Sequence, residues 1–254
     1  MPVPTLNPEP LPGLPQWAGV RVACSTRTGG VSAPPFDSLN LGDHVGDDPQ
    51  AVVTNRHRLR QLWGMHPVFL KQVHGTRVLE LDRHSPDGSE ADACFTRQPG
   101  LACTIMVADC LPLVFHHPEA GVVAAAHAGW RGLAAGVIEQ TLAVFQAMGE
   151  LSAVRVWLGP CIGPTAFEVG EEVRAAFMAH DLASAQAFEA LPVSSKYLAN
   201  LPALARQRLA VCGVEHIEGN DGSPTWCTFS QSQRFFSHRR DGRSGRFAVG
   251  IGMV

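Results

Sequence analysis

Cys110 lies where an apolar run ends, and His127 follows seventeen residues later at the end of a second run. His74, in K-Q-V-H-G, occupies another expected strand end. A cysteine near a histidine base can act as a nucleophile. One thiolate and two imidazoles can also bind Zn²⁺ and leave a fourth coordination position open, as catalytic zinc sites do. The third interpretation is a small buried hydrophobe, which describes most free cysteines.

The neighbours of Cys110 bear on these interpretations. Asp109 places a carboxylate at the strand end, where it either orients a ligand or points to the opposite face of the strand. Pro112 predicts that the strand stops there. His116 and His117 are competing ligands, but H-H-P-E is typical of a surface turn.

Arginines and glycines offer sites for an anion. Arg131 lies at an expected helix start, where free amides and a guanidinium can hold a phosphate, or where the glycines of H-A-G-W-R-G only shape a tight turn. Arg239 and Arg240 belong to a basic segment that either clamps an anionic substrate or forms an exposed hairpin turn. The same segment includes Arg243, for which the exposed turn is favoured, and Arg246.

Two further segments are rich in turn residues. Arg27 and Asn40 flank a long loop, which is often functional in a compact domain, and they can recognise hydroxyls or an anion. Cys161 lies in G-P-C-I-G-P, for which a plain turn is favoured.

The composition favours an ordinary soluble globular protein with a small-molecule partner. The chain of 254 residues is 45% hydrophobic and 17% charged, with a net charge of -3, which predicts neither disorder nor nucleic-acid binding. We find no signal-peptide pattern and no run of about 18 apolar residues, so we expect a cytoplasmic protein without a membrane span. The sequence leaves monomer and homodimer open.

Several motif classes are excluded. The seven cysteines are odd in number and never form C-x-x-C, which argues against a disulfide framework and a cysteine-only zinc site. The paired H-x-H ligands of multicopper oxidases, the phosphate-loop and dinucleotide glycine signatures, and the cytidine-deaminase signature do not occur. Any metal site must therefore recruit histidine.

Hydrophobic periodicity predicts one α/β-type domain with mixed sheets over residues 19–254, after a proline-rich arm at residues 1–18. The expected helices span 51–64, 133–149, 168–181 and 201–213. The expected strands lie in 19–27, 67–81, 100–110, 121–129, 153–160 and 215–219, with two more around a basic turn in 227–254.

The motifs K-Q-V-H-G, A-D-A-C, V-A-D-C-L-P-L-V-F, H-A-G-W-R-G, L-G-P-C-I-G-P and S-H-R-R-D-G-R-S-G-R together resemble the YfiH-type laccase-domain family. Its members are also described as polyphenol oxidases, peptidoglycan-editing factors or purine nucleoside phosphorylases. The resemblance extends from about Arg27 to the end of the chain.

The resemblance implies zinc held by His74, Cys110 and His127, with copper as another candidate metal. It implies a layered sandwich of mixed sheets flanked by helices, similar to the cysteine hydrolase fold of cytotoxic necrotizing factor. The implied activity is phosphorolysis of adenosine, inosine and methylthioadenosine, with adenosine deamination and copper-dependent phenol oxidation also attributed to the family. A metal-free cysteine hydrolase or amidase that edits peptidoglycan precursors, and a noncatalytic metal-binding protein, remain alternatives.

Overall fold

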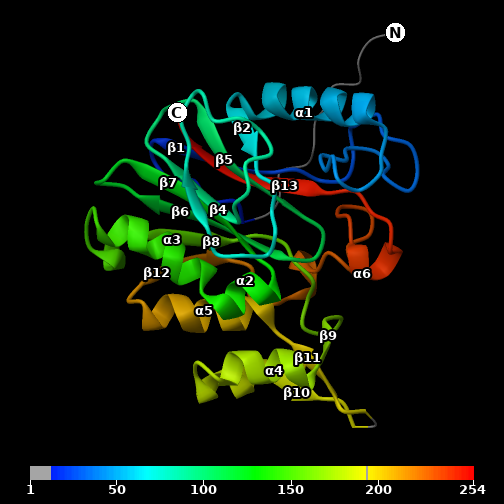
Figure 1. Ribbon diagram of the computed structural model, residues 1–254, viewed down its shortest axis with the longest axis vertical. Helices are drawn as coiled ribbons and strands as arrows, with labels where there is room; N and C mark the ends of the chain where they lie inside the picture. The colour runs from blue at the N-terminus through cyan, green and yellow to red at the C-terminus, as the bar shows by residue number, and fades with distance from the viewer. Residues whose placement is uncertain (1–12, 193) are drawn as a thin grey trace.

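Two β-sheets pack face to face at the centre of the protein, and helices cover both outer faces (Figure 1). The computed structural model describes residues 13–192 and 194–254, so residues 1–12 of the predicted arm lie outside the described part of the chain. Both sheets contain parallel and antiparallel strand pairs. The predicted mixed sheets and flanking helices are therefore confirmed.

The four-stranded sheet has the order β1-β13-β5-β2, and the six-stranded sheet has the order β12-β8-β6-β7-β4-β3. The first comprises β1 (Val20–Cys24), β13 (Phe247–Met253), β5 (Leu101–Val107) and β2 (His66–Phe69). The second comprises β12 (His216–Gly219), β8 (Arg155–Leu158), β6 (Leu111–His117), β7 (Val122–Ala128), β4 (Ala93–Thr96) and β3 (Val78–Glu80).

Helices cover the two outer faces. α1 (Pro49–Trp63) packs on the four-stranded sheet, while α3 (Val137–Gln146) and α5 (Leu201–Val211) pack on the six-stranded sheet (Figure 1). A small third sheet of β9 (Glu168–Gly170), β11 (Lys196–Ala199) and β10 (Phe188–Ala190) adjoins α4 (Glu171–Met178). The remaining helices are α2 (Trp130–Ala135), α6 (His238–Asp241) and short 3-10 turns at Leu151–Ala153, Leu182–Ala187 and Pro224–Trp226.

The central strands are apolar on both faces because each face is covered. Every residue of β5 is buried; Ile105 belongs to the core between the sheets, and its neighbour Met106 packs in the core under α1. Such burial produces a nearly continuous apolar run instead of alternation. Within the described residues, no helix is both long enough and apolar enough to cross a bilayer.

The described end of the predicted arm packs onto this core. Trp17 is buried, and its Nε1 donates a hydrogen bond of 3.0 Å to Glu218 Oε1. Trp157 Nε1 donates to the carbonyl of Gly13 at 2.8 Å. Residues 13–18 therefore contact the domain, while the boundary drawn after residue 18 stays a prediction.

Three expected elements differ from the structure. The helix expected at 133–149 is divided into α2 and α3 by Gly136, whose φ of 100° is incompatible with a continuous right-handed helix. The segment 168–181 begins as strand β9, because it pairs with β11 before α4 starts. The hairpin expected in 227–254 is wrong, since this segment contains α6 and only β13, which pairs with β1 and β5.

Two expectations around Cys110 are also corrected. β5 ends at Val107, and Pro112 lies inside the next strand, β6, near its start, where a missing N–H is tolerated. His116 and His117 are the buried last residues of β6, so they do not lie in a surface turn. The turn follows them.

Candidate metal centre

The centre forms where the chain crosses from one central sheet to the other. The short connection between β5 and β6 contains Cys110. In the β6–β7 register Pro112 lies opposite His127, which brings Cys110 close to His127. The loop carrying His74 is attached to β5 by Gln72, whose side chain donates to the carbonyl of Met106 at 2.8 Å and accepts from its N–H at 2.9 Å.

His74, Cys110 and His127 form one compact cluster. One ligand atom from each residue lies within 4.8 Å of the other two. Cys110 Sγ is 3.8 Å from His74 Nε2, and the two imidazole ring centroids are 4.8 Å apart at an interplanar angle of 71°. The structure therefore brings together all three residues that the resemblance implies as ligands.

Asp92 is the buried anchor of this cluster. Its carboxylate accepts backbone N–H bonds from Val73 at 3.1 Å, His74 at 2.9 Å and Gly75 at 2.7 Å. It also accepts a 2.8 Å bond from Nδ1 of His127, so Nε2 of that ring is left to face the cluster. The three amides surround the carboxylate in the manner of an anion nest, which holds His74 at a left-handed φ of 63°.

Asp109 is held in a second left-handed conformation, with φ of 88°. One carboxylate oxygen accepts a bond from Thr228 Oγ1 at 2.7 Å, and the other accepts from the backbone N–H of Arg239 at 2.7 Å. These contacts tie the residue before Cys110 to the carboxyl-terminal segment. Left-handed non-glycine residues persist where the surroundings enforce them, often at functional sites.

The charges of the cluster favour a thiolate. Burial alone would raise the pKa of the Cys110 thiol, but the charge of His127 and hydrogen bonds from His127 and His74 lower it to about 6. Burial would lower the pKa of His127, but the Cys110 thiolate and Asp92 raise it to about 9. At neutral pH, without a metal, the pair is therefore a thiolate beside an imidazolium, and the thiolate form is the one that binds metals or attacks carbon.

The glycines of H-A-G-W-R-G permit close approach. A Cβ on Gly129 would lie 2.9 Å from His74 Cδ2 and 3.0 Å from Cys110 Sγ. A Cβ on Gly132 would lie 2.8 Å from the carbonyl oxygen of Gly75. Both glycines therefore let α2 pack directly against the cluster and its loop, which supports the tight-turn interpretation.

A cavity of about 390 Å³ opens onto the cluster. Its walls include the three cluster residues and the apolar residues at the end of β5 and just after it. The basic side chains of His44, His238 and Arg246 also line it. Arg27, Asn40, Arg131, Arg239 and Arg240 do not line this cavity within the described part of the chain.

The predicted anion-binding arginines near the cluster make other contacts. The guanidinium of Arg239 donates to the carbonyl of Glu168 at 3.0 Å. The guanidinium of Arg240 donates to three backbone carbonyls and to a neighbouring carboxylate. Exposed Arg131 lies over the ring of Trp130, with its Cζ 4.4 Å from the centroid. Their anion-binding roles stay predictions.

Arg27 and Asn40 organise the long loop before α1. Arg27 donates to the carbonyl of Asp37 at 3.0 Å and stacks over an aromatic ring. Asn40 is fully buried; its Nδ2 donates to Asp47 at 2.9 Å, and its Oδ1 accepts the backbone N–H of Arg246 at 2.8 Å. Through these contacts both side chains stabilise the long loop itself.

Comparisons with known proteins show the family of this chain. The sequence profile of the family described as "multi-copper polyphenol oxidoreductase laccase" matches residues 21–254. The chain belongs to this laccase-domain family. It is similar to the purine nucleoside phosphorylase YfiH of Escherichia coli K12, with 49% identity over 96% of this chain and 98% of the relative. A purine nucleoside phosphorylase of Pseudomonas aeruginosa is also 49% identical, over 93% and 95%.

Solved structures of laccase-domain relatives have the same architecture. A Neisseria meningitidis protein of the DUF152 family superposes with a TM-score of 0.87 at 42% identity, covering 94% of this chain and 97% of that one. YlmD of Geobacillus stearothermophilus gives a TM-score of 0.83 at 30% identity, covering 95% and 99%. The similarity to a cytotoxic necrotizing factor fold stays a prediction.

Sequence reasoning missed Asp92, because the stretch H-S-P-D-G-S-E-A-D-A-C-F-T, which contains it, was interpreted as a loop. The available signal was an aspartate directly before an apolar stretch, which is in fact β4. Cys161 is buried beside Asn220, whose Nδ2 donates to its Sγ at 3.3 Å, and it is not part of the cluster.

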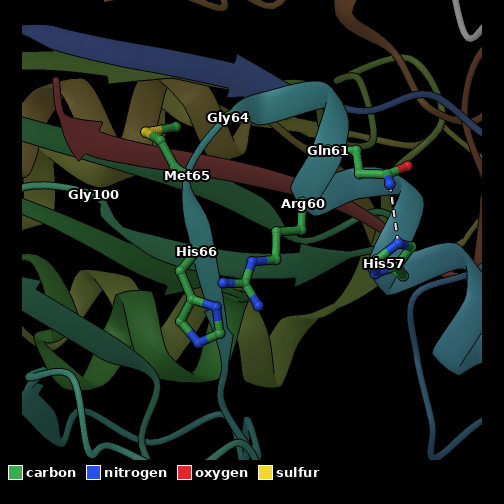
Figure 2. Close-up of a pocket in the computed structure, with 7 residues that line it drawn as sticks. All are labelled: His57, Arg60, Gln61, Gly64, Met65, His66 and Gly100. Carbon is green, nitrogen blue, oxygen red and sulfur yellow. Dashed lines mark hydrogen bonds between the residues drawn. The ribbon is translucent and has the colours of Figure 1, made fainter.

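A second cavity, of about 430 Å³, lies at the carboxyl end of α1 and shares no lining residue with the first. Figure 2 shows Arg60 of the helix extending toward His66 at the start of β2, while Gln61 is bonded to His57 at 3.0 Å. None of the cluster residues lines it, so the chemistry of the site belongs to the first cavity.

Proposed function

We propose that this protein is a zinc-dependent purine nucleoside phosphorylase whose reacting centre is the cluster of His74, Cys110 and His127. The observation that carries this proposal is the convergence of the three side chains on one cavity, in a chain that is 49% identical to relatives named purine nucleoside phosphorylases. The proposed substrates are adenosine, inosine and methylthioadenosine with inorganic phosphate, and adenosine deamination is the proposed second reaction.

The donor set fits a zinc ion. Two imidazole nitrogens and one thiolate are ligands that Zn²⁺ accepts, and a site with three protein ligands keeps a position open. Asp92 on Nδ1 of His127 is the kind of outer partner that fixes a ligand's tautomer and orientation. A bound ion would supply a Lewis acid at the cavity wall. Copper also fits this donor set, so the identity of the ion is part of the test.

The proposed reaction joins phosphate to the sugar. A phosphate oxygen forms a bond to C1′ of the ribose, and the bond from C1′ to N9 of the purine breaks. The purine leaves with the electron pair of that bond and takes the proton released by phosphate, which gives ribose 1-phosphate and the free base. For this reaction the cavity must hold both reactants in contact, because water competes with phosphate for C1′.

Product analysis tests this proposal. Protein purified without a histidine tag, with its metal quantified, is incubated with adenosine in the presence and absence of phosphate. We expect adenine and ribose 1-phosphate only when phosphate is present, and inosine with ammonia under both conditions. No conversion of any nucleoside by metal-loaded protein would contradict the proposal.

A metal-free cysteine hydrolase or amidase is the second candidate, favoured by the thiolate and imidazolium pair of Cys110 and His127. In that case Cys110 attacks a carbonyl carbon, His127 protonates the leaving amine, and water releases the acyl group. Amide hydrolysis by protein stripped of metal would support this candidate, whereas dependence of all activity on the ion would exclude it. Phenol oxidation confined to copper-loaded protein would support the oxidase attributed to the family.

A further inference from the structure

Three basic side chains line the cavity together with the His74, Cys110 and His127 cluster. Arg246 comes from the segment just before β13, His44 from the long loop before α1, and His238 from α6. His238 and Arg246 belong to the same basic segment, whereas His44 is far from them in the sequence, so the fold brings the long loop and this segment to one cavity.

Hydrogen bonds hold both the backbone and the side chain of Arg246. Its N–H donates to Asn40 Oδ1 at 2.8 Å, and its carbonyl accepts from the N–H of Leu41 at 3.0 Å. Its Nη1 donates to the carbonyls of Ser244 at 2.8 Å and Gly245 at 3.0 Å. The stem of the side chain is therefore fixed while part of the guanidinium fork faces the cavity.

The rest of that fork lacks a protein partner. Among the residues that the structure describes, no carboxylate forms an ion pair with Arg246, and its Nε and Nη2 donate no hydrogen bond. Burial lowers the pKa of this guanidinium, and Cys110 and Asp109 partly offset that effect. Neither nitrogen is among the buried unpartnered atoms of the described residues, so both are accessible, and an anion in the cavity that Arg246 lines can accept from them.

His44 adds a hydrogen-bonding imidazole to the same wall. Both residues line the cavity, and partial burial and the charge of Arg246 lower the pKa of His44. Asp43 partly opposes this effect, with its Oδ1 3.4 Å from His44 Nδ1. A neutral imidazole beside a guanidinium can donate a hydrogen bond to a bound anion.

We propose that Arg246, with His44 and His238, forms the phosphate subsite of this cavity, an assignment that rests on the proposed phosphorylase function. Phosphorolysis requires an oxyanion beside the ribose C1′, and a guanidinium fork matches the spacing of phosphate oxygens. The alternative arginines, Arg239 and Arg240, do not line this cavity within the described part of the chain.

Kinetics with Arg246→Gln tests the assignment. We expect the KM for phosphate to rise by about 10-fold to 100-fold, because a hydrogen bond to a charged group is lost, while the KM for adenosine changes less than about threefold. The matched control is Arg243→Gln, an exposed arginine of the same segment that stacks on Phe36 and does not line the cavity. An unchanged phosphate KM in Arg246→Gln would overturn the assignment.

A second variant keeps the charge and moves the side chain. A Cβ on Gly42 would lie 2.8 Å from Arg246 Cγ, so Gly42→Ala displaces the stem of the arginine. We expect a raised phosphate KM here as well, with the thermal unfolding of each variant measured to confirm that it is folded. A Gly42→Ala protein with a wild-type phosphate KM would contradict the assignment.

Direct binding separates this inference from the proposed reaction. Inorganic phosphate is titrated into metal-loaded wild-type, Arg246→Gln and Arg243→Gln proteins by calorimetry, without nucleoside. Binding that is lost only in Arg246→Gln supports the subsite even if no nucleoside is converted. Equal phosphate binding by all three proteins overturns the subsite, and it leaves the phosphorylase proposal to be judged by its own products.

Discussion

The Asp92 carboxylate accepts a hydrogen bond of 2.8 Å from Nδ1 of His127 while the same carboxylate anchors the loop that carries His74. One buried side chain thus orients two of the three residues of the candidate metal centre. Its own pKa is lowered, because hydrogen bonds from His127 and Gly75 outweigh the opposing effect of burial. Asp92 is a positioning residue, since it acts through the histidines.

Asp92→Asn should weaken metal binding. The asparagine has nearly the same shape but offers an amide in place of one carboxylate oxygen, so it cannot hold the histidine and all three amides as before. We expect zinc affinity to fall by about 10-fold to 100-fold, as for other partners of metal ligands. Competition with a chromophoric chelator measures this, and Asp37→Asn, a carboxylate outside the cavity, is the control. Equal affinities in the two variants would contradict the role of Asp92.

Gly129→Ala should disturb the cluster by steric contact alone. The backbone φ of Gly129 is -62°, which alanine adopts freely, but its Cβ would approach Cys110 Sγ to 3.0 Å. We expect reduced metal content and a loss of about 1–3 kcal/mol in stability, as for an overpacked site. Gly100→Ala is the control, because open space surrounds that position although its φ is 81°. Metal content measured by mass spectrometry should fall only in Gly129→Ala.

Asp109 permits a test of backbone strain before Cys110. Asp109→Ala and Asp109→Gly both remove the two carboxylate bonds, but only glycine adopts a φ of 88° without strain. We expect alanine to reduce the free energy of unfolding by about 1–2 kcal/mol more than glycine. Urea unfolding measures the difference, and a glycine variant no more stable than the alanine variant would show that the local backbone relaxes.

His116 should make the fold sensitive to acid. Its Nδ1 is buried without a partner in the described structure, its ring stacks on Trp17, and burial lowers its pKa to about 4. Because the unfolded chain binds the proton more readily, stability is full above pH 6.5 and falls as the pH drops toward 4. Between pH 6.5 and pH 4, we expect the free energy of unfolding of His116→Gln to fall by about 1–3 kcal/mol less than that of the wild type. Exposed His216→Gln should leave the pH profile of unfolding unchanged.

The sequence predicted the architecture where strands are long and apolar. The segments around β5 and β7 were located because burial on both faces leaves continuous apolar runs. β6 was missed, since Pro112 suggested a strand end and H-H-P-E suggested a turn, yet burial of both histidines outweighed these local signals. The division of the helix at Gly136 depends on a single left-handed residue, which periodicity does not reveal.

The candidate site was likewise predicted only in part from the sequence. The grouping of His74, Cys110 and His127 was expected from the family resemblance, after their residue types had made them candidates. The anchoring role of Asp92 depends on long-range contacts with residues 17 to 35 positions away, which no local pattern predicts. For the same reason the basic cluster was assigned through Arg239 and Arg240, whereas the cavity is lined by Arg246.

Formation of ribose 1-phosphate by protein stripped of metal and then reloaded with a single ion tests the central claim most directly. The account predicts no phosphorolysis of adenosine by the stripped wild-type protein, recovery with zinc, and no recovery in Cys110→Ser, whose hydroxyl is a poor replacement for the thiolate ligand. Phosphorolysis at the full rate by stripped protein, or by Cys110→Ser, would contradict it.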